Sequence, residues 1–116
     1  MKVIIYQIVP ELDEKHLMFR DLQTIVSKSD EKIPEEIYGA VFEGNLNAQN
    51  LEDVFRILNC AQPPEYHARS LSVSDVVEII RSDEDRNFYF CDSFGFKPVS
   101  FDKSAVYKNQ EEKNEM

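Results

Sequence analysis

The chain has 116 residues and a formal net charge of −9, with 42% hydrophobic and 11% aromatic residues. This length and composition predict one globular domain that buries about 65% of the surface of its unfolded chain, and they argue against a wholly disordered protein. Direct binding to nucleic-acid phosphates is disfavoured, because it needs clustered lysine and arginine, whereas acids are in excess here.

The first third of the chain predicts one strand and one short helix. Residues 2–9 form an apolar run that ends at a proline, which is typical of a central strand buried on both faces. Residues 11–20 are mixed, and we expect a loop there whose residues 17–19 cover the core. Asp21 is expected to cap a helix over residues 22–28, which carries apolar side chains at helical spacing.

The middle of the chain predicts two more helices. Pro34 suits the first position of a short helix, because proline lacks the N–H that this position leaves unpaired. Residues 40–46 are ambiguous between a strand and continued helix, and the turn signal that follows favours a strand. Asn50 is expected to cap the clearest helix, residues 51–59, whose apolar face is Leu51, Val54, Phe55 and Leu58.

The last third predicts a three-stranded antiparallel meander. Residues 76–80, 88–91 and 94–101 are short runs rich in β-branched and aromatic side chains, with polar turns between them. The polar residues 82–87 are expected to form a hairpin loop, and Gly95 suggests a bulge or a sharp bend. The predicted fold class is therefore α+β, with an antiparallel sheet (the N-terminal strand plus the meander) packed against two to three short helices.

We expect a single domain over residues 1–107 and a disordered charged tail over residues 108–116. The opening apolar run is too short for a secretion signal or a membrane span, so a cytoplasmic protein is expected. Cys60 and Cys91 lie in hydrophobic contexts without metal-ligand spacing, which favours two reduced buried thiols. Neither a metal nor another cofactor is expected, since the histidines are isolated and the few glycines are scattered.

A polar cluster before and after the meander's first strands contains the parts of a Ser-His-Asp arrangement. Its members are Tyr66, His67, Arg69, Ser70, Ser72, Ser74, Asp75, Asp92 and Ser93. The chain has no G-x-S-x-G elbow, and spacing alone does not position a base beside a serine. We therefore expect no enzyme activity, with the serines and Asp75 satisfying turn amides, Arg69 pairing with Asp75 or Asp92, and His67 at the surface.

The acids and aromatic residues of the meander suggest a protein interface. Asp83, Glu84 and Asp85 lack the spacing of a calcium loop and are expected at a solvated hairpin tip. If Tyr89 and the side chains on its face lack a covering helix, they form an apolar patch rimmed by acids. The candidate partner-binding residues are therefore Asp83, Glu84, Asp85, Tyr89, Asp92, Tyr66, His67 and Arg69.

Several blocks of the sequence resemble the YodL-like domain family. They are Asn59 and residues 63–67, 69–77 and 90–96, together with residues 3–7 and 51–53, and the resemblance spans about residues 3–102. Residues 65–68 depart from the family's glycine-bearing pattern, which implies a different turn geometry there. The resemblance implies a small domain found in Firmicute genomes and on their mobile elements and phages, with no established enzyme activity or catalytic residues.

These observations together predict a non-catalytic protein-binding module, encoded by a mobile element or phage, that binds and inhibits or modulates a host or defence protein. The expected partner is a protein, such as a basic nucleic-acid-handling enzyme, with no direct contact to nucleic acid or membrane. One alternative is an acidic nucleic-acid mimic of the anti-CRISPR or anti-restriction kind, with two rows of acids on one face. A small Ser/His/Asp hydrolase and a homodimer through an open strand edge also remain open.

Overall fold

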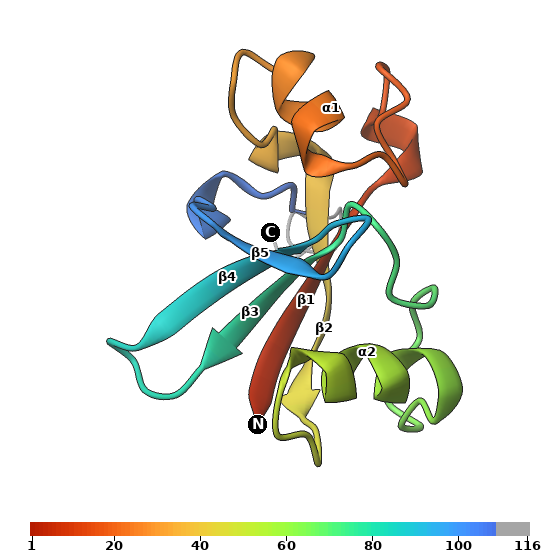
Figure 1. Ribbon diagram of the computed structural model, residues 1–116, viewed down its shortest axis with the longest axis vertical. Helices are drawn as coiled ribbons and strands as arrows, with labels where there is room; N and C mark the ends of the chain where they lie inside the picture. The colour runs from red at the N-terminus through yellow and green to blue at the C-terminus, as the bar shows by residue number, and fades with distance from the viewer. Residues whose placement is uncertain (109–116) are drawn as a thin grey trace, which may run out of the picture.

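A five-stranded antiparallel sheet forms the centre of the protein in a computed structural model that describes residues 1–108. The strand order is β2-β1-β3-β4-β5, and every neighbouring pair is antiparallel (Figure 1). The strands are β1 (Lys2–Ile8), β2 (Tyr38–Asn45), β3 (Val76–Ile80), β4 (Arg86–Cys91) and β5 (Phe96–Val99). The predicted α+β class is confirmed, but the sheet contains β2 in addition to the N-terminal strand and the meander.

Two short helices accompany the sheet, α1 (Leu22–Ser27) and α2 (Leu51–Cys60). Both begin at the predicted caps. The Asp21 side chain accepts a hydrogen bond from the backbone N–H of Thr24, and the Asn50 side chain accepts one from that of Asp53. Each cap satisfies one N–H that the first helical turn leaves without a partner. Neither helix is long and apolar enough to cross a membrane, and no other helix of residues 1–108 is.

β1 is an inner strand of the sheet, between β2 and β3, and because both of its faces are apolar it separates two hydrophobic cores. Ile4, Tyr6 and Ile8 point to one face, where the residues around α1 and the end of the described chain cover them. Val3 and Ile5 point to the other face, against α2 and the segment that leads to β3 (Figure 1). Side chains alternate between the faces of a strand, so a continuous apolar run needs cover on both sides.

Glu78 of β3 is a fully buried acid within one of these cores. Its carboxylate accepts a 2.7 Å hydrogen bond from the Tyr6 hydroxyl and lies 3.4 Å from the Lys103 ammonium. Nε of Arg86 approaches to 3.3 Å, but its N–H is not directed at an acceptor. Burial and the hydrogen bond to Glu78 both raise the pKa of the Tyr6 hydroxyl. Three groups thus compensate the buried charge, and Glu78 is a structural residue.

The structure corrects several local predictions. The helix expected at Pro34 is only a 3-10 turn, Glu35–Ile37, because β2 begins at Tyr38 and pairs with β1. The third strand of the meander begins at Phe96 rather than at 94, since Gly95 takes a φ of +80° in the turn before it. Further 3-10 turns are Pro10–Leu12 and Lys103–Ala105. The expected tail lies outside the described residues apart from Lys108.

Candidate functional site

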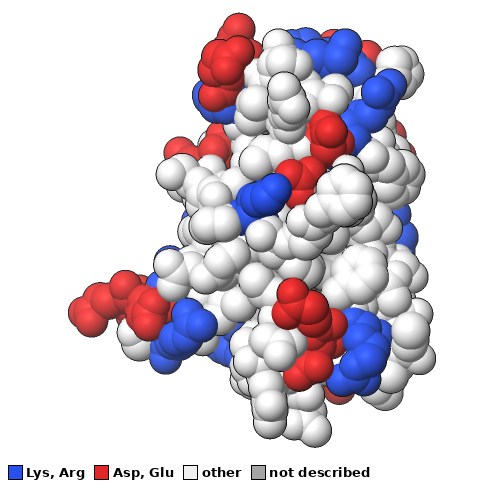
Figure 2. Space-filling model, in the orientation of Figure 1, with Lys and Arg blue, Asp and Glu red and all other residues white. Residues whose placement is uncertain are grey.

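The three acids of the β3–β4 loop lie at the tip of a hairpin that projects from the body of the protein (Figures 1 and 2). Asp83, Glu84 and Asp85 are all exposed, as expected. The loop is held by the backbone N–H of Asp85, which donates to Ser82 Oγ at 3.1 Å. Asp92 follows the other end of β4, so the hairpin separates it from these acids by the length of the strand.

The other candidate residues lie in the segment between α2 and β3 or on β4. Tyr66 is buried, and its hydroxyl donates to the Arg69 carbonyl at 2.6 Å, so it supports the fold and not a surface. His67 is exposed. Tyr89 is half-buried, because the core beneath α2 covers one side of it. Arg69 pairs with neither predicted acid, since its Nη2 donates to the Ile8 carbonyl at 3.0 Å.

Asp75 is the centre of a buried hydrogen-bond network that explains the Ser/Asp-rich turn. Its side chain is fully buried, and Oδ2 accepts from the Ser72 N–H at 2.8 Å and from Gln7 Nε2 at 3.0 Å. Oδ1 has no partner. Burial raises the pKa of this carboxyl to about 7, although the two hydrogen bonds and the Arg69 charge oppose the rise. The turn therefore anchors the segment before β3 to β1.

The residues needed for hydrolysis are present but not assembled. Within residues 1–108, no hydrogen bond joins His67 to a serine or an acid. The Ser72 hydroxyl donates to the Ser70 carbonyl at 3.0 Å, while the Ser74 hydroxyl accepts from the Phe19 N–H. A serine nucleophile needs a base within hydrogen-bonding distance, and the described geometry supplies none.

The cysteines and the metal-binding residue types form no site in the described part of the chain. Residues 1–108 contain no group of three or more His, Cys, Asp or Glu placed to hold a metal ion. Both cysteines are free, and Cys91 is buried, which raises the pKa of its thiol to about 12. The expectation that Cys60 is buried was wrong, because the last residue of α2 turns away from the helix's apolar face.

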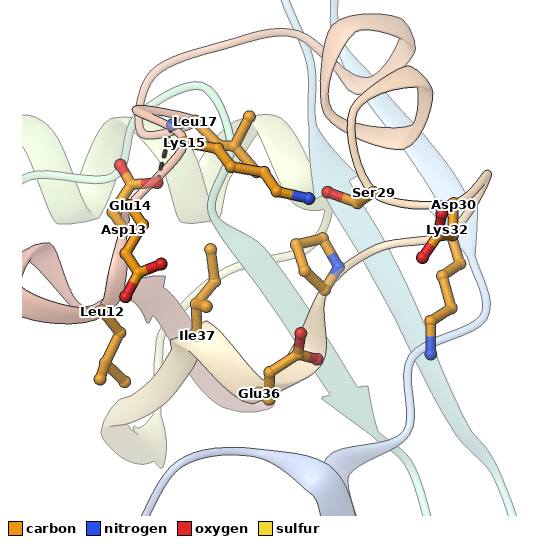
Figure 3. A pocket seen from close by; sticks show the side chains of 11 residues that line it. Leu12, Asp13, Glu14, Lys15, Leu17, Ser29, Asp30, Lys32, Glu36 and Ile37 are labelled. Atoms are coloured by element: carbon orange, nitrogen blue, oxygen red, sulfur yellow. Dashed lines mark hydrogen bonds between the residues drawn. The ribbon is translucent and has the colours of Figure 1, made fainter.

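A cavity of about 210 Å³ lies between the loop before α1 and the segment joining α1 to β2 (Figure 3). Its lining carries both acids and lysines, namely Asp13, Glu14, Lys15, Asp30, Lys32 and Glu36. Asp13 accepts the backbone N–H groups of Leu17 and Met18, and Lys15 donates to the Lys28 carbonyl. In Figure 3 the Lys15 ammonium and the Ser29 hydroxyl point toward each other. Opposite charges around one cavity favour neither an anion nor a cation.

The β4–β5 turn presents the most exposed aromatic side chain among the large hydrophobic residues described. Phe94 is 90% exposed, and the neighbouring Gly95 occupies the left-handed region that the turn requires. Beside it, the rings of Phe55 and Phe96 pack edge to face with their centroids 6.5 Å apart. These rings border a mostly apolar groove of about 270 Å³, and Glu52 of α2 and Asp92 lie at the same groove.

Phe19 is another exposed aromatic residue, and it lies in the loop before α1. It is 55% exposed, has a φ of +71°, and the Arg69 guanidinium lies over its ring at 5.6 Å. Its N–H donates to Ser74 Oγ, and the N–H of Leu22, the first residue of α1, donates to Oδ1 of Asp92, which follows β4. A bulky residue at positive φ is strained, and such strain clusters at functional sites. We call Phe55, Phe94 and Phe96 the aromatic surface.

Sequence reasoning placed Phe19 and two rings of the aromatic surface elsewhere. Phe19 was expected over the core and Phe55 on the buried face of its helix, but they are 55% and 41% exposed. Phe94 was expected in a strand. The one available signal was the Phe94-Gly95 pair, since a glycine at a turn brings its neighbour out of the sheet.

Comparison with known protein families identifies the family of this chain. The YodL-like domain matches the chain over residues 2–101, which include all five strands and both helices. No curated protein and no solved structure is significantly similar to the chain. The match covers most of the sequence, so the chain belongs to the YodL-like domain family.

Proposed function

We propose that this protein is a non-catalytic protein-binding module and that the aromatic surface is its binding site. The observation that carries the proposal is the 90% exposure of Phe94 beside an apolar groove. Contiguous exposed apolar patches with a polar rim are typical of interaction sites in proteins that are otherwise soluble. Aromatic residues are also enriched where protein interfaces have their strongest contacts.

The chemistry of the groove favours a partner with an apolar side chain next to basic residues. Burying one phenylalanine or leucine side chain contributes about 1.5–3 kcal/mol to the free energy of binding. A partner side chain buried in the groove and Phe94 buried by the partner would each contribute on this scale. Glu52 and Asp92 line the groove, and the Lys97 ammonium lies 3.6 Å from the Asp92 carboxylate. The net charge of −9 accelerates encounter with a basic protein surface.

The consequence of binding that we propose is inhibition or modulation of a host or defence protein. The family resemblance to domains of mobile elements and the acidic body support this reading. The nucleic-acid-mimic alternative needs two rows of acids on one face. On the face in Figure 2 the acids form separate groups with uncharged and basic side chains between them, which favours the aromatic surface over mimicry.

The test is affinity capture from a bacterial lysate with three forms of the chain: the natural sequence, Phe94→Ser and Tyr107→Ser. Tyr107 is the matched control, because it is an exposed aromatic residue outside the aromatic surface. We expect a basic protein that the natural and Tyr107→Ser chains retain at low salt and that Phe94→Ser loses. Washing at high salt weakens the encounter but not the apolar contact. Retention that is the same for all three chains contradicts the proposal.

A further inference from the structure

The cavity between the loop before α1 and the segment joining α1 to β2 contains a buried hydroxyl group that the fold does not use. Ser29 lines this cavity and is 7% exposed, and its Oγ has no hydrogen-bond partner. Its backbone groups are paired, because its N–H donates to the Val26 carbonyl and its carbonyl accepts from the Lys32 N–H. Folded proteins pair most buried hydroxyls, since an unpaired one costs free energy. The Ser29 hydroxyl is therefore suited to bind a molecule that enters the cavity.

The Lys15 ammonium places a positive charge beside this hydroxyl. It donates one hydrogen bond, to the Lys28 carbonyl at 2.8 Å, which holds it at the cavity. In Figure 3 it points toward the Ser29 hydroxyl, and Lys32 lines the same cavity. An ammonium has three N–H donors, so two remain for a ligand. A carboxylate accepts several hydrogen bonds and matches this pair of donors.

The acids at the cavity divide into one that supports the fold and three that are available. Both oxygens of Asp13 accept backbone N–H groups of its own loop. Glu14, Asp30 and Glu36 are exposed, and the ion pairs within residues 1–108 involve other side chains. In Figure 3 Glu36 lies across the cavity from the Lys15 ammonium. The available acids suit an ammonium group of a ligand.

The remaining lining is apolar and limits the size of the ligand. Two of its residues are buried and two are partly buried; we call Leu12, Leu17, Pro34 and Ile37 the apolar floor. The volume of about 210 Å³ is below the roughly 300–1,000 Å³ of pockets for drug-sized molecules. In the part of the chain that the structure describes, these acids are not placed to hold a metal ion. A small organic molecule with an apolar part fits this lining.

We propose that the cavity binds a free amino acid with an apolar side chain of about the size of leucine. Its carboxylate binds the Lys15 ammonium and the Ser29 hydroxyl, its ammonium faces Glu36, and its side chain packs on the apolar floor. A molecule with both charges uses both sets of residues, whereas the acids repel a simple anion and the lysines repel a simple cation. This cavity shares no residue with the groove at the aromatic surface.

The first test titrates the full chain with L-leucine up to about 10 mM, which detects a Kd near 1 mM, and follows two-dimensional amide NMR spectra. We expect shifts confined to residues 12–17 and 29–37. The analogues 4-methylpentanoate, without the ammonium, and 3-methylbutylamine, without the carboxylate, should each bind about tenfold more weakly or worse. The proposal is overturned if leucine shifts no resonance, or if either analogue binds as tightly as leucine does.

Ser29→Ala separates ligand binding from stability. Removing an unpaired buried hydroxyl should leave the free energy of unfolding unchanged or raise it. The Kd for leucine should rise about fivefold, the loss expected for one hydrogen bond. A clear loss of stability would mean that the hydroxyl already has a partner within the fold, and an unchanged Kd would mean that it does not contact the ligand. Either result contradicts the proposal.

Two pairs of matched variants test the charges. Lys15→Gln should weaken leucine binding about tenfold, whereas Lys28→Gln should not, because the Lys28 side chain is exposed and does not line the cavity. Glu36→Gln should also weaken binding, and Glu11→Gln, an exposed acid outside the cavity, should not. The NMR spectra show whether each variant folds. Equal effects within each pair would mean that net charge, and not this cavity, governs binding, which overturns the assignment.

Discussion

Asp75→Asn should change how the stability of this protein depends on pH. The carboxyl of Asp75 is fully buried, and burial raises its pKa from 3.8 to about 7. The folded state thus binds this proton more tightly than the unfolded state does. The contribution of Asp75 to stability is fully present below about pH 4, is lost as pH rises toward 7 and is constant above it. A shift of about three units corresponds to about 4 kcal/mol.

Asparagine cannot ionise, so the variant lacks this dependence while its side-chain oxygen can still accept the Ser72 N–H. Relative to the natural chain, Asp75→Asn should gain about 4 kcal/mol in free energy of unfolding between pH 4 and pH 8. Urea unfolding at four pH values across this range measures the difference. Tyrosine fluorescence or circular dichroism is the signal, because the chain has no tryptophan.

The difference in free energy of unfolding between the two chains cancels the contributions of the other titrating groups, because both chains carry them. Asp83→Asn is the control, since Asp83 is exposed at the hairpin tip, and its difference from the natural chain should stay constant with pH. The reasoning is refuted if the difference for Asp75→Asn is equally flat. That result would mean that Arg69 and the hydrogen bonds from Gln7 and Ser72 fully offset the burial of the charge.

Three further substitutions test the packing and the turns by urea unfolding. Leu58→Ala should lower the free energy of unfolding by about 2–5 kcal/mol, because Leu58 is fully buried on the inner face of α2. Phe55→Ala should lower it less, because Phe55 is partly exposed. Equal losses for the two variants would contradict the assignment of the helix face. Asn50→Ala should cost about 1 kcal/mol through loss of the α2 cap, and Asn50→Ser should recover most of it. Gly95→Ala should lower the free energy of unfolding by about 1–2 kcal/mol because of the φ of +80°, although no atom obstructs the added carbon. Gly95→Asn should lower it less. No loss of stability in either variant would contradict the turn geometry.

Local features of the sequence were sufficient to predict most of the elements. The apolar run over residues 2–9 identified β1, and Asp21 and Asn50 marked the starts of both helices. These signals act within one turn or one strand, so they operate whatever the rest of the chain does. The glycine at position 95 marked a bend for the same reason, because its backbone requirement is local.

Sequence did not predict which faces are covered, because that depends on residues far apart in the chain. Gln7 occurs in an apolar run, yet its amide reaches Asp75, 68 residues later. Phe19 carries no local mark of exposure. Its position follows from the hydrogen bond to Ser74 and the contact with Arg69, which are 55 and 50 residues further along the chain.

The sequence by itself determined the α+β class, the first strand buried on both faces, the helix caps and the acidic hairpin tip, because each follows from composition, periodicity or a single turn. Tertiary structure alone decided that Asp75 of the polar cluster is a buried anchor, that Phe55 and Phe96 meet at one groove and that β2 is an outer strand of the sheet. Which residues are buried and which strands are neighbours depend on the folded chain as a whole. In this protein, both depend on the pairing of β1 with β2 on one side and with β3 on the other.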